Sequence, residues 1–134
     1  MTAAENARAA AVPAWVLGFM SAIDTLDFEP GFEVLTEDTV MHFGTERVDG
    51  RRAIQDFFVR IDEPLEISHR VLEYWVADGG VRLLRGEATM ARKDAPERVV
   101  SAPFIHIFYL ADEEPVRVRE IRITAGPLET DAVM

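Results

Sequence analysis

The stretch of sequence that decides the fold is VRLLRGEATMARKDAPERVVSAPFIHIFYL, residues 81–110. It reads as two β-strands, Val81–Arg92 and Arg98–Leu110, because inward-facing and outward-facing side chains follow a period of two. Between them, Asp94-Ala95-Pro96 is a turn signal. Strands with so short a connection pair with each other antiparallel, so this hairpin anchors the rest of the predicted sheet.

The inward face of this hairpin combines small side chains with one histidine. Gly86 and Ala88 on the first strand leave space instead of filling it, which favours a cavity over a filled core. On the second strand, His106 lies between Phe104 and Phe108 on the same face. Burial disfavours the imidazolium and lowers the pKa of a histidine, so His106 is the candidate polar group of an apolar pocket, as a neutral donor or a base. The alternative is a core histidine bonded to a backbone carbonyl or a buried water.

The outward face of the second strand is also apolar. It carries Ile105, Ile107 and Tyr109. Because an exposed apolar face needs a cover and the helices occupy the other face, we expect a homodimer through the outer face of the sheet.

The flanking segments extend the hairpin to a complete α+β domain. Further strands are predicted at Thr39–Gly44, Leu65–Val76 and Val116–Thr124, the last with a bulge near Arg119-Glu120. Apolar periodicity predicts helices over Trp15–Leu26, over Phe32–Leu35 and around Ile54–Ile61, with a turn at Val48-Asp49-Gly50 and a helix end at Pro64. The predicted fold is three N-terminal-half helices packed in the concave face of a strongly curved antiparallel sheet, a cystatin-like cone.

Length and charge limit the classes of function. The chain has 134 residues, which predicts one domain over residues 15–128 with flexible segments at 1–14 and 129–134. A net charge of -10 disfavours nucleic acid and membrane surfaces as partners. The chain has no cysteine, which favours a reducing compartment, and we expect a cytoplasmic protein.

Several short motifs resemble one known family. The order of elements is similar to the nuclear transport factor 2-like superfamily, and within it to the SnoaL-like group with polyketide cyclases, limonene epoxide hydrolase and ketosteroid isomerase. The resemblance implies a cone around an apolar cavity, and many members act without a cofactor. The motifs that carry it are Thr36-Glu37-Asp38-Thr39-Val40, Asp49-Gly50-Arg51-Arg52-Ala53-Ile54, Gly86-Glu87-Ala88-Thr89, Ala102-Pro103-Phe104 and Phe108-Tyr109-Leu110.

The same resemblance places few catalytic groups in this chain. An epoxide hydrolase of this type implies charged residues at Gly86, Ala88 and Ile121 and water-binding residues at Met41 and Phe43, so that activity is disfavoured. A ketosteroid isomerase implies a base near Phe43, a phenol near Phe19 and an acid at about His106. Only His106 keeps a polar group.

The candidate site therefore has one catalytic residue, His106, within an apolar wall. His69 shares the inward face of its strand, with a place near the hairpin start or the dimer edge as the alternative, and His42 is expected to point outward. Asp24 and Asp27 could face the mouth of the cone, but we expect them to be solvated or to cap the next turn. The three histidines lack the spacing of a metal site, so no metal is predicted. The predicted ligand-binding residues are Trp15, Phe19, Met41, Phe43, Phe57, Phe58, His69, Gly86, Ala88, Met90, Phe104, Phe108 and Ile121.

The function that fits these features is a cofactor-free enzyme acting on a small apolar ligand, by isomerase-, cyclase- or hydrolase-like proton transfer. The first alternative is a non-catalytic binding module for a hydrophobic metabolite. The second is an interaction protein whose cone is filled by its own side chains.

Overall fold

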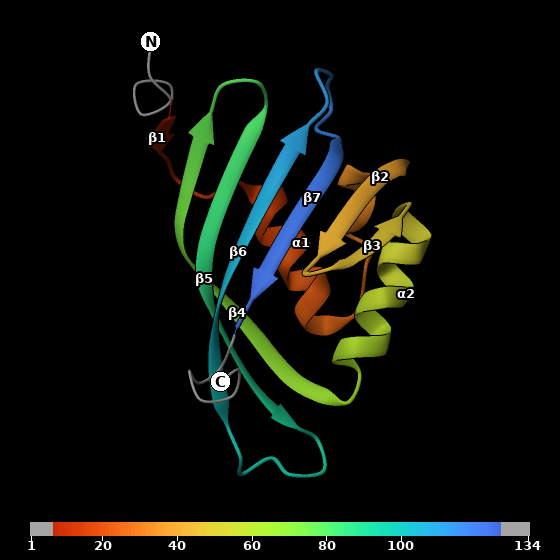
Figure 1. Ribbon diagram of the computed structural model, residues 1–134, viewed down its shortest axis with the longest axis vertical. Coiled ribbons are helices and arrows are strands. Elements are labelled where there is room, and N and C mark those ends of the chain that lie inside the picture. The colour runs from red at the N-terminus through yellow and green to blue at the C-terminus, as the bar shows by residue number, and fades with distance from the viewer. Residues whose placement is uncertain (1–6, 127–134) are drawn as a thin grey trace.

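Seven strands form one curled sheet in the computed structural model, which describes residues 7–126 (Figure 1). The predicted hairpin is confirmed, with β5 at the predicted bounds and Gly86 opposite Phe104. In sheet order the strands are β1 (Ala7–Ala9), β4 (Leu65–Ala77), β5 (Val81–Arg92), β6 (Val100–Leu110), β7 (Val118–Ala125), β2 (Leu35–Phe43) and β3 (Glu46–Asp49). The strands β4 to β7 form the expected antiparallel meander.

The edge of the sheet around β2 differs from the prediction. Strand β2 pairs parallel with β7, so the sheet is mostly but not wholly antiparallel. The predicted turn at Val48-Asp49-Gly50 is wrong for its first two residues, which belong to β3. The chain reverses earlier, at Gly44-Thr45, where Gly44 has a φ of 58° that glycine adopts without steric cost.

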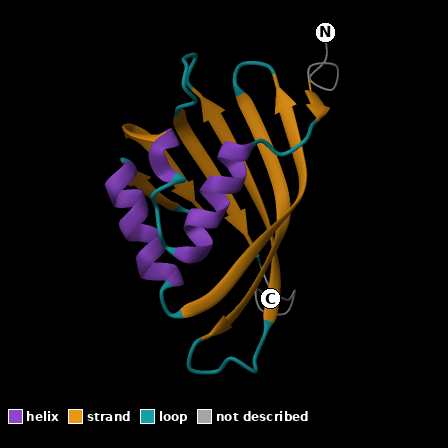
Figure 2. Cartoon of the chain, turned by 180° about the vertical axis from the view of Figure 1, so that it is seen from behind, coloured by secondary structure: helices purple, strands orange, loops and turns teal. Residues whose placement is uncertain are grey.

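Two α-helices and one short turn cover the concave face of the sheet (Figure 2). The α-helices are α1 (Ala14–Thr25) and α2 (Arg51–Asp62). The third predicted helix, over Phe32–Leu35, is shorter than expected and is not an α-helix, because Phe32–Val34 forms a 3-10 helix, η1. Leu35 is already extended and begins β2, which leaves no room for a second helical turn. No helix within residues 7–126 is long and apolar enough to cross a membrane.

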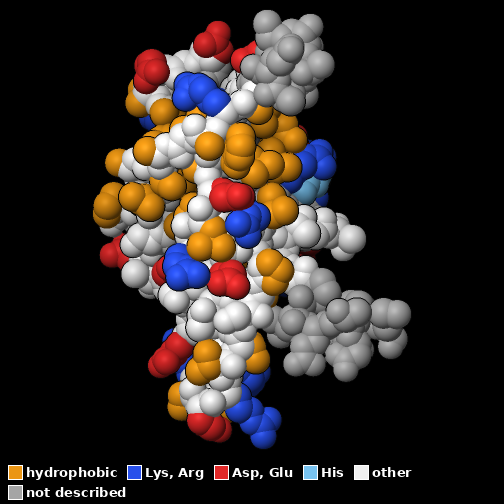
Figure 3. All heavy atoms as spheres, turned by 90° about the vertical axis from the view of Figure 1, so that its left-hand side faces the viewer, with side chains coloured by type: hydrophobic (Ala, Val, Ile, Leu, Met, Phe, Trp, Pro, Cys, Tyr) orange, Lys and Arg blue, Asp and Glu red, His pale blue; other side chains and the backbone are white. Residues whose placement is uncertain are grey.

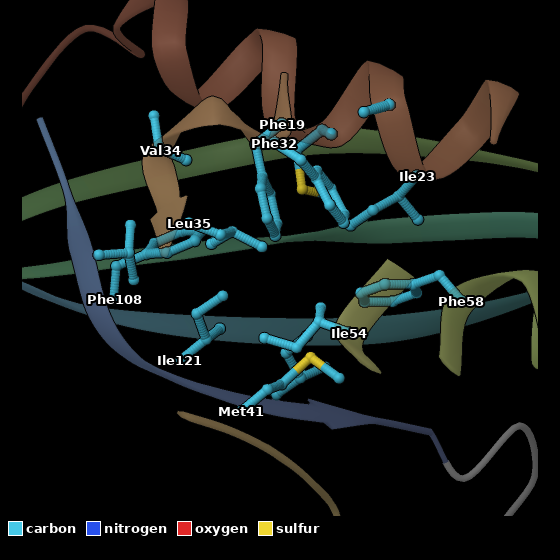
Figure 4. Packing of buried hydrophobic residues seen from close by; sticks show 14 of the residues in the cluster. Phe19, Ile23, Phe32, Val34, Leu35, Met41, Ile54, Phe58, Phe108 and Ile121 are labelled. Atoms are coloured by element: carbon cyan, nitrogen blue, oxygen red, sulfur yellow. The ribbon is translucent and has the colours of Figure 1, made fainter. Parts of the chain in front are cut away.

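The core lies between the helices and the sheet. Phe19 and Ile23 on α1 point toward Phe58 on α2, and Met41 and Ile121 approach from the strands (Figure 4). All five side chains are at most 2% exposed. Their burial holds both helices against the concave face, since apolar area removed from water is the main stabilising contribution.

The predicted bulge in β7 is confirmed, and it explains the change of register in that strand. Glu120 pairs with Tyr109 and Val118 pairs with Leu110, which leaves Arg119 as the extra residue. Both Val118 and Ile121 are therefore fully buried, although three residues separate them.

Thr39 ties β2 to β7 at the end of the cone. Its hydroxyl donates to the carbonyl oxygen of Val118 at 2.6 Å and accepts from the backbone N–H of Thr36 at 2.8 Å. The side chain is fully buried. The first motif of the family resemblance therefore has a structural role, since it joins the parallel strand pair.

The outer face of the sheet carries an apolar strip. The strand register places Trp75, Leu83 and Ile107 side by side on β4, β5 and β6. Ile105 on the same face is 40% exposed, and Tyr109 is half-buried. Figure 3 shows apolar side chains gathered in the upper half of the neighbouring edge, where β1 and β4 lie.

Of the two predicted terminal segments, the structure describes only part of the first. Strand β1 falls within the segment 1–14 and pairs with Trp75–Ala77 of β4. The segment 129–134, for which flexibility is predicted, lies outside the described residues.

Candidate functional site

A cavity of about 210 Å³ lies between the concave face of the sheet and the C-terminal ends of α1 and α2. Apolar protein cavities of about 150 Å³ already bind benzene, so the space is large enough for a small molecule. The cavity is lined by Ile23, Phe43, Phe58, Ile61, Asp62, Leu65, Ile67, His69, Ala88, Met90, Ala102, Phe104, His106, Ile123 and Ala125.

The structure brings about half of the predicted site residues to this cavity. Those that line it are Phe43, Phe58, His69, Ala88, Met90, Phe104 and His106. The aromatic residues Trp15 and Phe108 pack edge to face, and Phe57 packs against Phe43. Phe19, Met41, Phe108 and Ile121 are buried in the closed part of the core, so they support the walls and do not line the space.

Gly86 does not leave the open space that its sequence suggests. A Cβ at this position would lie 2.1 Å from the carbonyl oxygen of Arg70 and 2.6 Å from the ring of Phe104. The ring of Phe104 therefore occupies the room above Gly86. Of the two small residues, only Ala88 adds volume to the cavity.

His69, which lines the cavity, forms a hydrogen-bonded pair with Asp24, which does not itself line it. Nδ1 of His69 lies 2.5 Å from Oδ1 of Asp24, and the backbone N–H of His69 donates to Oδ2 at 3.1 Å. A carboxylate only accepts hydrogen bonds, so Nδ1 carries a proton, and in the neutral ring Nε2 has the lone pair. The expectation that Asp24 is solvated or caps a turn is wrong, because β4 returns past the end of α1.

Asp62 is a carboxyl group in the wall with no protein partner. It is 6% exposed, and no donor within residues 7–126 bonds to it. Among those residues, Nδ1 of His106 is the one side-chain atom that is both fully buried and without a hydrogen-bond partner. The oxygens of Asp62 also lack a partner, so they are not fully buried. Burial raises the pKa of Asp62 from 3.8 to about 6, with a smaller lowering by His69 and a further raising by Asp24. The carboxyl therefore meets the cavity.

His106 is a neutral side chain in this environment. It is 3% exposed, and burial lowers its pKa to about 3, with a further contribution from the charge of His69. Nδ1 has no partner among the described residues. An orphaned lone pair costs less than an orphaned N–H, so the proton belongs on Nε2, the ring nitrogen left to meet a ligand. His106 thus presents a hydrogen-bond donor to the cavity.

Asp24 and Asp62 are the polar site residues that the sequence did not predict. Asp62 continues the buried face of α2, because it follows Ile54 and Phe58 at steps of four residues. A carboxylate on the apolar face of a predicted helix was the signal from which Asp62 could have been predicted as a site residue. Asp24 carried a weaker signal, since its partner lies 45 residues away on a different element.

No lysine or arginine lines the cavity within residues 7–126. Arg92, at the end of β5, is exposed and pairs with Asp94 through two hydrogen bonds of 2.9 Å. His42 is half-buried and lies outside the cavity. The titratable side chains that line the cavity are therefore one carboxyl group, Asp62, and two imidazoles, His69 and His106.

Solved structures share this fold. A protein of Jannaschia sp. CCS1 assigned as a SnoaL-like polyketide cyclase aligns with a TM-score of 0.71 at 20% identity, over 90% of this chain and 86% of that chain. A protein of Xanthomonas campestris pv. campestris assigned as a polyketide cyclase aligns with a TM-score of 0.68 at 17% identity, over 81% and 85%. An LEH-like epoxide hydrolase of M. tuberculosis aligns with a TM-score of 0.66 at 19% identity, over 84% and 80%.

These likenesses establish the fold, and the family follows from the sequence. A comparison with curated protein sequences gives no match. The sequence model of the SnoaL-like domain family matches residues 16–118, which span most of the cone and the β5–β6 hairpin. The chain therefore belongs to the SnoaL-like domain family, within the nuclear transport factor 2-like superfamily.

Proposed function

We propose that the protein is a cofactor-free cytoplasmic enzyme that moves a proton on a small, largely apolar substrate. The observation that carries this proposal is the Asp24–His69 pair in the wall of an apolar cavity. A histidine held at one ring nitrogen by a carboxylate offers the other nitrogen as a general base. Isomerisation, cyclisation and related eliminations all begin with such a transfer.

The proposed step uses groups already present in the chain. Nε2 of His69 takes a proton from a carbon next to a carbonyl group, and the electrons of the broken C–H bond move onto the carbonyl oxygen. The Nε2–H group of His106 donates a hydrogen bond to that oxygen as its negative charge develops. Asp24 stabilises the imidazolium, which then returns its proton to the product.

Epoxide hydrolysis of the limonene type is not part of this proposal. The positions that the family resemblance assigns to that chemistry hold Met41, Phe43, Gly86, Ala88 and Ile121. None of these side chains can polarise an epoxide or position a water.

Hydrogen–deuterium exchange tests the proposal without an identified substrate. The wild-type protein in D₂O should catalyse exchange of the protons next to the carbonyl of small ketones such as cyclohexanone, followed by proton NMR. His69→Gln should reduce the catalysed rate about 10²- to 10⁴-fold, the usual contribution of a general base. Asp24→Asn should also reduce it, because the ring loses the negative charge that stabilises its imidazolium form.

His42→Gln is the matched control, since it makes the same change at a histidine outside the cavity. It should exchange at the wild-type rate. Exchange by His69→Gln at the wild-type rate would refute the role of His69.

A second candidate function is a non-catalytic module that binds a hydrophobic metabolite. The sheet floor of the cavity favours it, because Ala88, Met90 and Ile123 carry no reacting group. Ligand binding by the wild-type protein with no exchange of any ketone would support this module and reject the enzyme.

A further inference from the structure

The polar groups of the cavity define what a ligand must carry. Nε2 of His106 is a donor that needs an acceptor, and Asp62 is an acceptor that needs a donor. Neither has a protein partner among the described residues. A buried polar group without a hydrogen-bond partner costs free energy. A ligand that pairs with both His106 and Asp62 therefore gains more binding free energy than a ligand that pairs with only one of them.

The polar lining of the cavity disfavours one class of ligand. Asp62 is the carboxyl group that lines it, and His106 stays neutral because of its burial. An anion would give up its hydration next to Asp62, with no lysine or arginine in the lining to compensate. Carboxylates and phosphates are therefore poor ligands.

The volume sets the scale of the ligand. At about 210 Å³ the cavity exceeds the about 150 Å³ that accepts benzene, so it has room for one ring with small substituents. Phe43, Phe58 and Phe104 supply flat apolar walls for a single ring with small substituents.

We infer that the cavity takes a single-ring compound that is not an anion and that has both a carbonyl group, bound by His106, and a hydroxyl group, bound by Asp62. This inference rests on the proposed function, since it names the substrate class of the same site. It also gives the reacting carbon a place, because the carbonyl that His106 binds is the one whose neighbouring proton goes to His69.

Binding of four ring probes at about pH 8 tests the inference by NMR titration of the wild-type protein. 4-Hydroxycyclohexanone should bind about tenfold or more tightly than cyclohexanone, which lacks the hydroxyl, and than cyclohexanol, which lacks the carbonyl. Cyclohexanecarboxylate should bind more weakly than all three. Equal affinities for the first three probes, or tighter binding of the carboxylate, would overturn the inference.

Two variants assign each preference to its residue. Asp62→Leu should remove the advantage of the hydroxyl and keep that of the carbonyl, whereas His106→Phe should do the reverse. Asp56→Leu, on the exposed face of the same helix as Asp62, should keep both advantages. An Asp62→Leu protein that still prefers the hydroxyl compound would also overturn the inference.

The size limit is tested with 2-decalone, which has two fused rings and should bind more weakly than cyclohexanone. Tighter binding of 2-decalone would overturn the limit to one ring. Because all these measurements are equilibria, they remain informative if ketone exchange fails, and the exchange assay remains informative if these preferences are absent.

Discussion

Replacement of Asp62 by asparagine should stabilise the protein at about pH 8 but have little effect at about pH 4. Burial raises the pKa of Asp62 from 3.8 to about 6, so the folded protein holds the proton more tightly than the unfolded chain does. The stability that protonated Asp62 contributes is fully present below pH 3.8 and is lost as the pH rises through about 6. Asparagine does not titrate, so the variant escapes this loss.

The magnitude follows from the two pKa values. The interval from 3.8 to about 6, at about 1.4 kcal/mol for each pH unit, sets an upper limit of about 3 kcal/mol. The carboxyl faces an open cavity that admits water, which reduces the cost of its charge. We expect the free energy of unfolding of Asp62→Asn to exceed that of the wild type by about 1–2 kcal/mol at pH 8.

Urea unfolding of both proteins at about pH 4 and pH 8 measures this difference. Asp56→Asn makes the same chemical change on the exposed face of α2, and its difference from the wild type should be the same at both pH values. If Asp62→Asn were less stable than the wild type at pH 8, the carboxylate would be bonded in the folded protein. The account of an unpartnered group would then be wrong.

Three further predictions concern the frame of the site. Thr39→Val should lower the free energy of unfolding by about 1–3 kcal/mol, because it removes the buried hydrogen bond to the carbonyl of Val118. Thr124→Val, on the exposed face, should change this free energy little. Urea unfolding measures both variants. Gly86→Ala should lower the free energy of unfolding by about 1–3 kcal/mol or more, because the new Cβ meets the Arg70 carbonyl and the ring of Phe104. Gly18→Ala should instead raise it by up to about 1 kcal/mol, because the nearest atom to its new Cβ is Gly31 Cα at 3.8 Å and alanine favours the helix. A Gly86→Ala protein as stable as the wild type would contradict the packing described. We also predict a homodimer through the outer sheet face, so light scattering should give twice the chain mass for the wild type and the chain mass for Ile105→Arg; a wild-type monomer would reject that interface.

The sheet could be predicted from the sequence because its side-chain pattern is local. Alternation with a period of two set the bounds of β5 and the inward position of His106, and the break in that period located the bulge in β7. The parallel pairing of β2 with β7 could not be predicted in this way. It depends on which strands lie side by side once the helices have packed on the sheet. The alternation of side chains within one strand does not show which other strand it pairs with.

Among the polar groups of the candidate site, only those on the sheet could be predicted. His106 and Ala88 could be assigned from strand parity, which fixes the face of every side chain. Asp24 and Asp62 lie on helices, where a residue at the margin of the apolar face turns either to solvent or to the interior. Its direction is decided by what packs next to it, and for Asp24 that neighbour is His69 on β4.

Asp24, Asp62, His69 and His106 reach the site from two kinds of element. Asp24 and Asp62 come from the ends of α1 and α2, whereas His69 and His106 lie on the sheet, where His69 is the cross-strand partner of Ala88. A substrate ring that lies on Ala88 and Ile123 would thus have its carbonyl near His106 and another part of its edge near His69. In the family resemblance, the expected charged groups lie on the floor itself. Their replacement by apolar residues does not by itself remove acid–base chemistry, because His69, held by Asp24, and His106 supply it in the proposed mechanism.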